Sequence, residues 1–146
     1  SFNILRVRYY FDEIAVLDLY AGTGNICFEF ASRGVPAITA VDGHLGCIQY
    51  INKISEEFEF PINTVKSDVS KYLEKASGNY DVIFADPPYD FTTEALKKMM
   101  EVILAKSLLN SEGMLIIEHA KQNDLSSFPH FVEARKYGSS VFSFFN

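Results

Sequence analysis

Short apolar runs alternate with longer stretches of helical period along the chain, a pattern typical of an α/β domain with a parallel sheet. The apolar runs predict five strands: Ala15–Tyr20, Ala37–Asp42, Ile62–Lys66, Tyr80–Ala85 and Met114–Glu118. The intervening periodicity predicts helices over Asn25–Arg33, Leu45–Phe58, Val69 to about Ala76, and Thr92 or Thr93 to about Ser107. Turn-forming residues at 110–113 are expected to lead into the fifth strand.

The last part of the chain predicts an antiparallel hairpin. Its arms are Phe131–Lys136 and Ser139–Phe145, on either side of Tyr137-Gly138. The expected fold is therefore a doubly wound, mostly parallel seven-stranded sheet with a C-terminal antiparallel hairpin, in one domain over residues 1–146. Such sheets bind ligands at the carboxyl ends of their strands, so chemistry is expected after the first four strands.

A glycine-containing turn follows the first strand. Gly22 and Gly24 allow the backbone to approach a ligand closely and to adopt dihedrals that a side chain would disfavour. A dinucleotide fingerprint would require a third glycine at Cys27, so a nicotinamide-dependent dehydrogenase is disfavoured. By itself, the pair of glycines is equally consistent with an ordinary tight turn.

Acidic residues follow the second and third strands. Asp42 is suited to accept hydrogen bonds from ribose hydroxyls, and Asp68 from an exocyclic amine such as that of adenine. Taken singly, each is explained at least as well as a helix cap. Glycines, a ribose acceptor and an amine acceptor at three strand ends together favour a nucleoside ligand.

The most specific motif is Asp86-Pro87-Pro88-Tyr89, directly after the fourth strand. Two consecutive prolines stiffen the backbone and remove two amide donors, so a carboxylate and a rigid carbonyl remain as neighbouring acceptors. This pair suits an amino group with two hydrogens, and Tyr89 offers a flat face for stacking a base.

These motifs resemble those of S-adenosylmethionine-dependent amino-methyltransferases, and more narrowly the RsmD-type bacterial ribosomal RNA guanine-N2 methyltransferases. The segments that carry the resemblance, over nearly the whole chain, are 2–5, Leu17–Gly24, Ser32–Gly34, Phe84–Tyr89, Tyr137-Gly138 and 142–144. The resemblance implies the Rossmann-like fold of class I methyltransferases and methyl transfer to N2 of a guanine in small-subunit ribosomal RNA. DNA adenine-N6 or protein glutamine-N5 methylation is the alternative within the class, and a non-catalytic nucleotide-binding domain is the alternative outside it.

The resemblance also implies roles for individual residues. The expected cofactor-binding residues are Asp18, Tyr20, Gly22, Gly24, Asp42, Gly43, Asp68 and Val69. Among them, Asp18 and the two glycines would seat the methionine part, Asp42 the ribose, and Asp68 with the Val69 backbone the adenine. The expected catalytic residues are Asp86, Pro87, Pro88 and Tyr89, of which Asp86 and the Pro87 carbonyl would hold the target amine. The family commonly has Glu at position 42, but Asp keeps both acceptors.

The charge balance modifies this interpretation. Thirteen Lys and Arg against 19 Asp and Glu give 13 − 19 = −6, which is not the footprint of a module that holds RNA by itself. The family carries a longer basic N-terminal extension, so we expect that an RNA-gripping arm is missing and that Arg6, Arg8, Lys97 and Lys98 are a remnant of it. Ribosomal RNA or the small ribosomal subunit is the expected partner, bound weakly by these residues.

The remaining features exclude other classes. No apolar run approaches the roughly 20 residues needed to span a bilayer, and no secretory signal is visible, so we expect a cytoplasmic monomer. Cys27 and Cys47 are expected to be buried apolar thiols in a reducing compartment. The three histidines show no metal-ligand spacing, and His119 is expected to lie at the surface or to be hydrogen-bonded.

Overall fold

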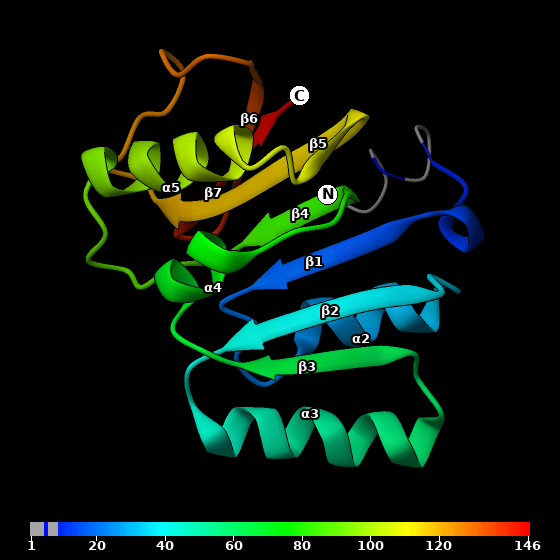
Figure 1. Ribbon diagram of the computed structural model, residues 1–146. Coiled ribbons are helices and arrows are strands. Elements are labelled where there is room, and N and C mark those ends of the chain that lie inside the picture. Colours follow the sequence, from blue (N-terminus) through cyan, green and yellow to red (C-terminus); the bar gives the residue numbers. More distant parts are fainter. Residues whose placement is uncertain (1–4, 6–8) are drawn as a thin grey trace.

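One seven-stranded sheet organises the part of the chain that is described, which in this computed structural model is Leu5 and residues 9–146 (Figure 1). The strands are β1 (Ala15–Leu19), β2 (Ala37–Asp42), β3 (Ile62–Lys66), β4 (Tyr80–Ala85), β5 (Leu109–Ala120), β6 (Phe131–Tyr137) and β7 (Ser140–Phe145). Their order is β3-β2-β1-β4-β5-β7-β6. The first five in this order are parallel, whereas β7 is antiparallel to both β5 and β6. The predicted doubly wound sheet with its closing hairpin is confirmed.

Helices cover both faces of this sheet. They are α2 (Asn25–Ser32), α3 (Leu45–Phe58), α4 (Val69–Lys75) and α5 (Thr93–Ala105), preceded by a short 3-10 helix, η1 (Phe11–Glu13). The alternating side chains of β1 show the two layers: Leu17 and Leu19 pack in a cluster with α4 and α5, whereas Val16 packs in a cluster with α2 and α3. Because helices bury both faces, the central strands β1 and β4 are mostly apolar, as is usual for parallel sheets, with Asp18 and Asp81 as exceptions.

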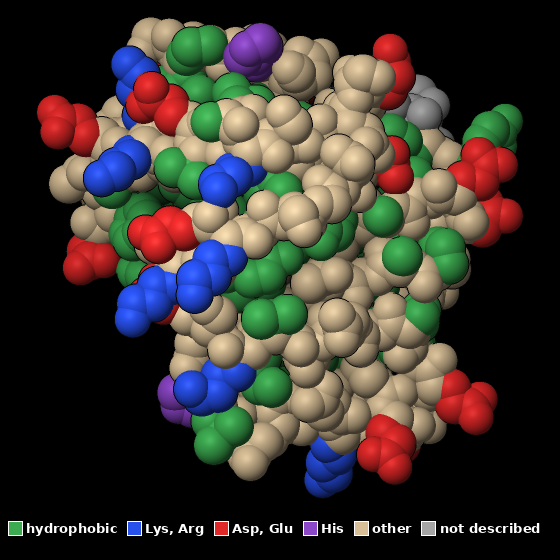
Figure 2. Space-filling view, viewed as in Figure 1, with side chains coloured by type: hydrophobic (Ala, Val, Ile, Leu, Met, Phe, Trp, Pro, Cys, Tyr) green, Lys and Arg blue, Asp and Glu red, His purple; other side chains and the backbone are tan. Residues whose placement is uncertain are grey.

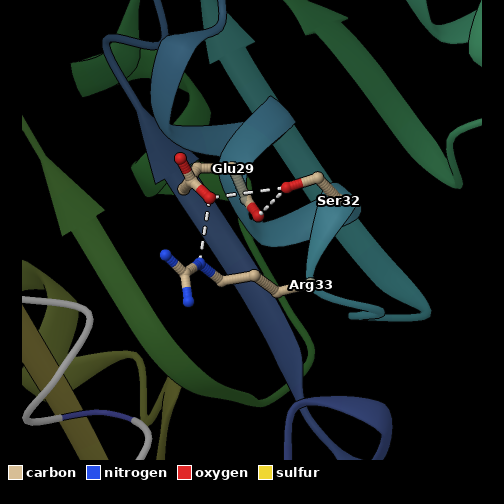
Figure 3. A network of polar contacts seen from close by, with 3 residues as sticks. All are labelled: Glu29, Ser32 and Arg33. Atoms are coloured by element: carbon tan, nitrogen blue, oxygen red, sulfur yellow. Dashed lines mark hydrogen bonds and ion pairs between the residues drawn. The ribbon is translucent and has the colours of Figure 1, made fainter.

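Side chains set the helix ends. Thr92 Oγ1 accepts a hydrogen bond from the Ala95 amide at 3.1 Å and caps α5. At the C-terminal end of α2, Glu29 Oε2 accepts a hydrogen bond from Arg33 Nε at 2.9 Å, and Ser32 Oγ donates one to the Glu29 carbonyl at 2.8 Å (Figure 3). Gly34 then takes a φ of 97°, so the predicted glycine stop signal is confirmed.

The first and fifth predicted strands need the main corrections, β5 also ends at Ala120 rather than Glu118, and the arms of the hairpin differ from the prediction by one residue each. β1 ends at Leu19, because Tyr20 has a φ of 58° and leaves the strand. β5 begins at Leu109 rather than Met114, so the predicted turn at 110–113 is wrong. Asn110 Nδ2 donates to Asp81 Oδ1 at 2.9 Å across an irregular pairing, and this long-range bond holds the polar segment against β4.

The predictions from the sequence also concern the N-terminal residues and the possibility of a membrane-spanning helix. Leu5 is buried in the core, whereas Arg6 and Arg8 and residues 2–4 of the resemblance lie outside the described residues. Among the helices that the structure describes, none combines the length and apolar character required to cross a bilayer.

Candidate functional site

Backbone hydrogen bonds tie four strand ends together at the carboxyl edge of the sheet. The Ala21 amide donates to the Val41 carbonyl at 3.0 Å, and the Ser67 amide donates to the Asp42 carbonyl at 3.0 Å. The Asp86 amide lies 3.4 Å from the Leu19 carbonyl. These bonds connect β1 to β2, β2 to β3 and β1 to β4, and sheet order reverses between β1 and β4. The predicted site residues therefore meet at the topological switch point, where doubly wound sheets bind ligands.

The turn after β1 requires glycine at Gly24. Its φ is 90°, and a Cβ there would lie 2.9 Å from the side-chain atoms of Ile51 and Phe28. It also caps α2 without a side chain. Gly22 has a φ of 58° and open space where its Cβ would be. Gly24 thus makes room for Ile51 and Phe28 in the core, whereas Gly22 leaves the turn open to the close approach of a ligand.

Asp18 lies beneath this turn and is only 1% exposed. Its Oδ2 atom is buried and has no hydrogen-bond partner among the described residues. Burial raises the pKa of Asp18 to about 8, and the charges of Asp86 and Asp42 add to this, while a hydrogen bond from the Cys27 backbone opposes it. Asp18 therefore holds its proton at neutral pH, and a donor or cation brought to the turn would favour its ionised form.

Of the two residues predicted to be either helix caps or ligand acceptors, Asp68 caps a helix and Asp42 does not. Asp42 is not a helix cap: its Oδ2 accepts from the Gly22 amide at 2.9 Å and its Oδ1 from the His44 amide at 2.8 Å. His44 caps α3 instead, through Nδ1 and the Cys47 amide. Asp68 does cap α4, since its Oδ1 accepts from the Lys71 amide at 3.1 Å. The carboxylate of Asp42 is therefore fixed against the glycine turn, where it can accept further hydrogen bonds.

Gly43, Val69 and Tyr20 have different surroundings. The Cα of Gly43 faces the loop after β3, because a Cβ built there would lie 3.7 Å from the Ser67 carbonyl oxygen. Val69 is buried in the core at the start of α4. The ring of Tyr20 lies edge-on to Phe91, with centroids 5.9 Å apart, and both rings line a cavity of about 270 Å³ between α4 and α5.

The Asp86–Tyr89 segment leaves β4 and lines a pocket of about 90 Å³. Pro87 is buried and fixes the segment to the sheet, whereas Tyr89 is 74% exposed at the mouth. Partial burial, followed by the charge of Glu118, raises the pKa of Asp86 to about 6. The four predicted catalytic residues thus border one pocket, beside the strand ends that carry the predicted cofactor residues.

Three pocket residues, Glu118, His119 and Ala120, come from β5 and were not among the predicted site residues. Glu118 and His119 line the same pocket as Asp86. His119 is buried, with Nδ1 2.9 Å from the Ala120 carbonyl and Nε2 2.7 Å from Ser143 Oγ, so the prediction of a hydrogen-bonded histidine is confirmed. Burial lowers its pKa, which keeps the ring neutral. Glu118 could have been noticed only from its position at the end of the fifth strand.

The cysteines are both free. Cys27 is buried as predicted, with Sγ 3.2 Å from the Gly24 carbonyl, and burial raises the pKa of its thiol. Cys47 is only half-buried, because α3 turns this position partly toward solvent, so full burial was a wrong prediction there. Within the described ranges, no three His, Cys, Asp or Glu side chains form a group suited to a metal ion.

A sheet of this order, with its glycine turn at the switch point, is the Rossmann-like fold of class I methyltransferases. A candidate methyltransferase of Escherichia coli, yhhF, has the same fold, with a TM-score of 0.87 over 99% of this chain and 81% of that one at 20% identity. The chain belongs to the family described as Conserved hypothetical protein 95, which matches residues 1–146.

Curated relatives bear names from ribosomal RNA methylation. The chain is 26% identical over 103 residues to the ribosomal RNA small subunit methyltransferase D of Buchnera aphidicola, covering 70% of this chain. It is 29% identical over 121 residues to YlbH of Bacillus subtilis, a candidate rRNA methyltransferase, covering 80% of this chain. The alignments span 52% and 65% of the lengths of these two relatives.

Proposed function

We propose that this chain transfers a methyl group from S-adenosylmethionine to N2 of a guanine in small-subunit ribosomal RNA. The observation that carries the proposal is the Asp86–Tyr89 pocket beside the glycine turn and Asp42, at one switch point. An acceptor pair for an amine and a seat for a nucleoside are then neighbours. The names of the two curated relatives favour ribosomal RNA as the substrate.

The residues at the turn fit S-adenosylmethionine. The cofactor carries donors and positive charge, which match the unpaired buried oxygen of Asp18 and the anchored carboxylate of Asp42. Gly22 leaves open space for its close approach. Asp68 would take the adenine amine through the oxygen that does not cap α4. When bound, this cofactor supplies an activated sulfonium methyl group.

The chain's own contribution to the reaction is orientation and polarisation of the target amine. The N2 lone pair of guanine is delocalised into the ring, so the amine is a weak nucleophile. Asp86 and the Pro87 carbonyl would accept its two hydrogens, fix the nitrogen and stabilise the positive charge that develops on it. Positioning of this kind contributes roughly 7–11 kcal/mol in well-oriented systems. Tyr89 would stack on the base.

The charged surface supports a nucleic-acid partner on one side of the molecule. In Figure 2, Lys and Arg side chains are frequent on the side that carries α4 and α5, and acidic side chains lie among them. The exposed lysines of these helices are Lys71, Lys75, Lys97 and Lys98. Since the chain as a whole has a net charge of −6, we expect weak, salt-sensitive RNA binding by these residues.

Calorimetry and a labelled-methyl assay test the proposal. S-adenosylmethionine and its demethylated product should bind the folded protein, and label should enter small ribosomal subunits rather than DNA or a glutamine-bearing release factor. Asp86→Ala should reduce transfer by roughly 100-fold or more and leave cofactor affinity unchanged. Asp90→Ala, an exposed neighbour, is the control. Absence of cofactor binding to folded protein would refute the proposal.

A further inference from the structure

A second carboxylate stands beside the amine-holding pair. Ala85, the last residue of β4, pairs with Ile117 of β5, so Asp86 directly after β4 and Glu118 within β5 occupy the next pair of positions. Both side chains line the same pocket of about 90 Å³. Glu118 therefore reaches the place where the target amine would be held, from a different strand.

In the described part of the chain, neither of these two carboxylates takes part in an ion pair. The ion pairs found there are Arg33 with Glu29 and Arg135 with Glu133, and neither involves the pocket. The residue opposite Glu118 on β7 is Phe142. Two acceptors of like charge facing one pocket repel each other, and a ligand with several adjacent N–H donors would relieve that repulsion.

Among groups with a methylatable amine, guanine has the matching donor pattern. Its N2 amine is flanked by the ring N1–H, so three donors lie along one edge. The adenine N6 amine is flanked instead by N1, an acceptor, and the cytosine N4 amine by N3, also an acceptor. A glutamine amide likewise places a carbonyl oxygen beside its nitrogen. An acceptor facing Glu118 would be repelled, whereas the guanine N1–H would be bound.

We infer that Glu118 is the residue that selects guanine, by accepting a hydrogen bond from N1–H while Asp86 and the Pro87 carbonyl hold N2. This inference rests on the proposed function and adds a base-reading residue to it. Discrimination of this kind is strong, because a base without N1–H leaves a carboxylate unpaired in the pocket.

2-Aminopurine provides the test, because it keeps the N2 amine but has an acceptor at N1. The methylated guanine is first mapped with wild-type full-length protein, and RNAs are then made with guanine or 2-aminopurine at that position. Wild type should favour guanine in kcat/KM by roughly 100-fold. Glu118→Gln, whose amide can donate or accept, should lower this ratio at least tenfold. Glu101→Gln, an exposed carboxylate-to-amide change on α5, should leave the ratio unchanged.

Binding gives a second readout. With the demethylated cofactor present, the fluorescence of 2-aminopurine RNA should report entry of the base into the pocket at lower protein concentrations for Glu118→Gln than for wild type. An unchanged guanine preference in Glu118→Gln overturns the inference, as does equal methylation of both RNAs by wild type. If wild type methylates no guanine in small-subunit RNA, the proposed function itself is wrong.

Discussion

Asp18 should make the stability of this protein fall as pH rises. Its pKa is about 8 in the folded state, because the side chain is buried and lies near Asp86 and Asp42, against 3.8 without these surroundings. The unfolded chain therefore releases this proton near pH 4, while the folded protein retains it until about pH 8. The free energy of unfolding should fall across this window by about 1.4 kcal/mol per pH unit, on the order of 5 kcal/mol in total.

Asp18→Asn isolates this contribution. The Asn oxygen can still accept from the Cys27 backbone, but the side chain does not titrate, so its share of the pH dependence should disappear. Urea unfolding at pH values from 4 to 9 gives the free energy of unfolding of wild type and variant, and the difference between the two should change with pH. Asp12→Asn, an exposed change in η1, corrects for loss of one negative charge. A variant with the same pH slope as wild type would show that Asp18 is ionised in the folded protein.

Three further outcomes are expected. Gly24→Ala should destabilise the fold by roughly 1–3 kcal/mol in thermal unfolding, because it adds both backbone strain and contacts of 2.9 Å, and should cost more than Gly78→Ala, where φ is positive but the space is open. Asp81→Ala should lower the free energy of unfolding by roughly 1–3 kcal/mol in urea unfolding and leave cofactor affinity unchanged. Its carboxylate accepts hydrogen bonds from the Ala15 amide of β1 and from Asn110 Nδ2 of β5, both far from the site. The rate of methyl transfer should rise with pH through about 6 as Asp86 ionises, and Glu118→Gln should move this limb to lower pH; a limb that does not move would contradict their coupling.

The sequence predicted the strand ends well because their signals are local. Apolar runs ending in Gly22–Gly24 or in Asp86-Pro87-Pro88 carry their own turn chemistry, and tertiary contacts did not override it. Residues 110–113 have equally good turn chemistry, yet they join β5, because Asp81 bonds to Asn110 from 29 residues away. A contact of this range leaves no local pattern.

Long-range pairing also explains why Glu118 was not among the predicted site residues. A glutamate at the end of a strand is unremarkable by itself, and it becomes chemically informative only when β5 is known to pair with β4. Asp42 and Asp68 likewise share a residue type and a position after a strand, but one anchors the glycine turn and the other caps α4. Strand order and loop contacts, which single-residue patterns do not encode, decide these cases.

Acidic side chains are concentrated at the proposed binding site, which accounts for part of the negative net charge. Asp42, Asp86 and Glu118 lie at or near the carboxyl ends of β2, β4 and β5, where the two proposed ligands would present donors and positive charge. Phosphates would be repelled by these carboxylates and attracted to the exposed lysines of α4 and α5, which are Lys71, Lys75, Lys97 and Lys98. An RNA bound along the lysines would thus keep its backbone away from the acidic pocket and could insert only an extruded base, with its donor edge leading. The acidic pocket and the lysines outside it are therefore both compatible with the same binding mode, in which the lysines hold the RNA backbone and the pocket receives the base.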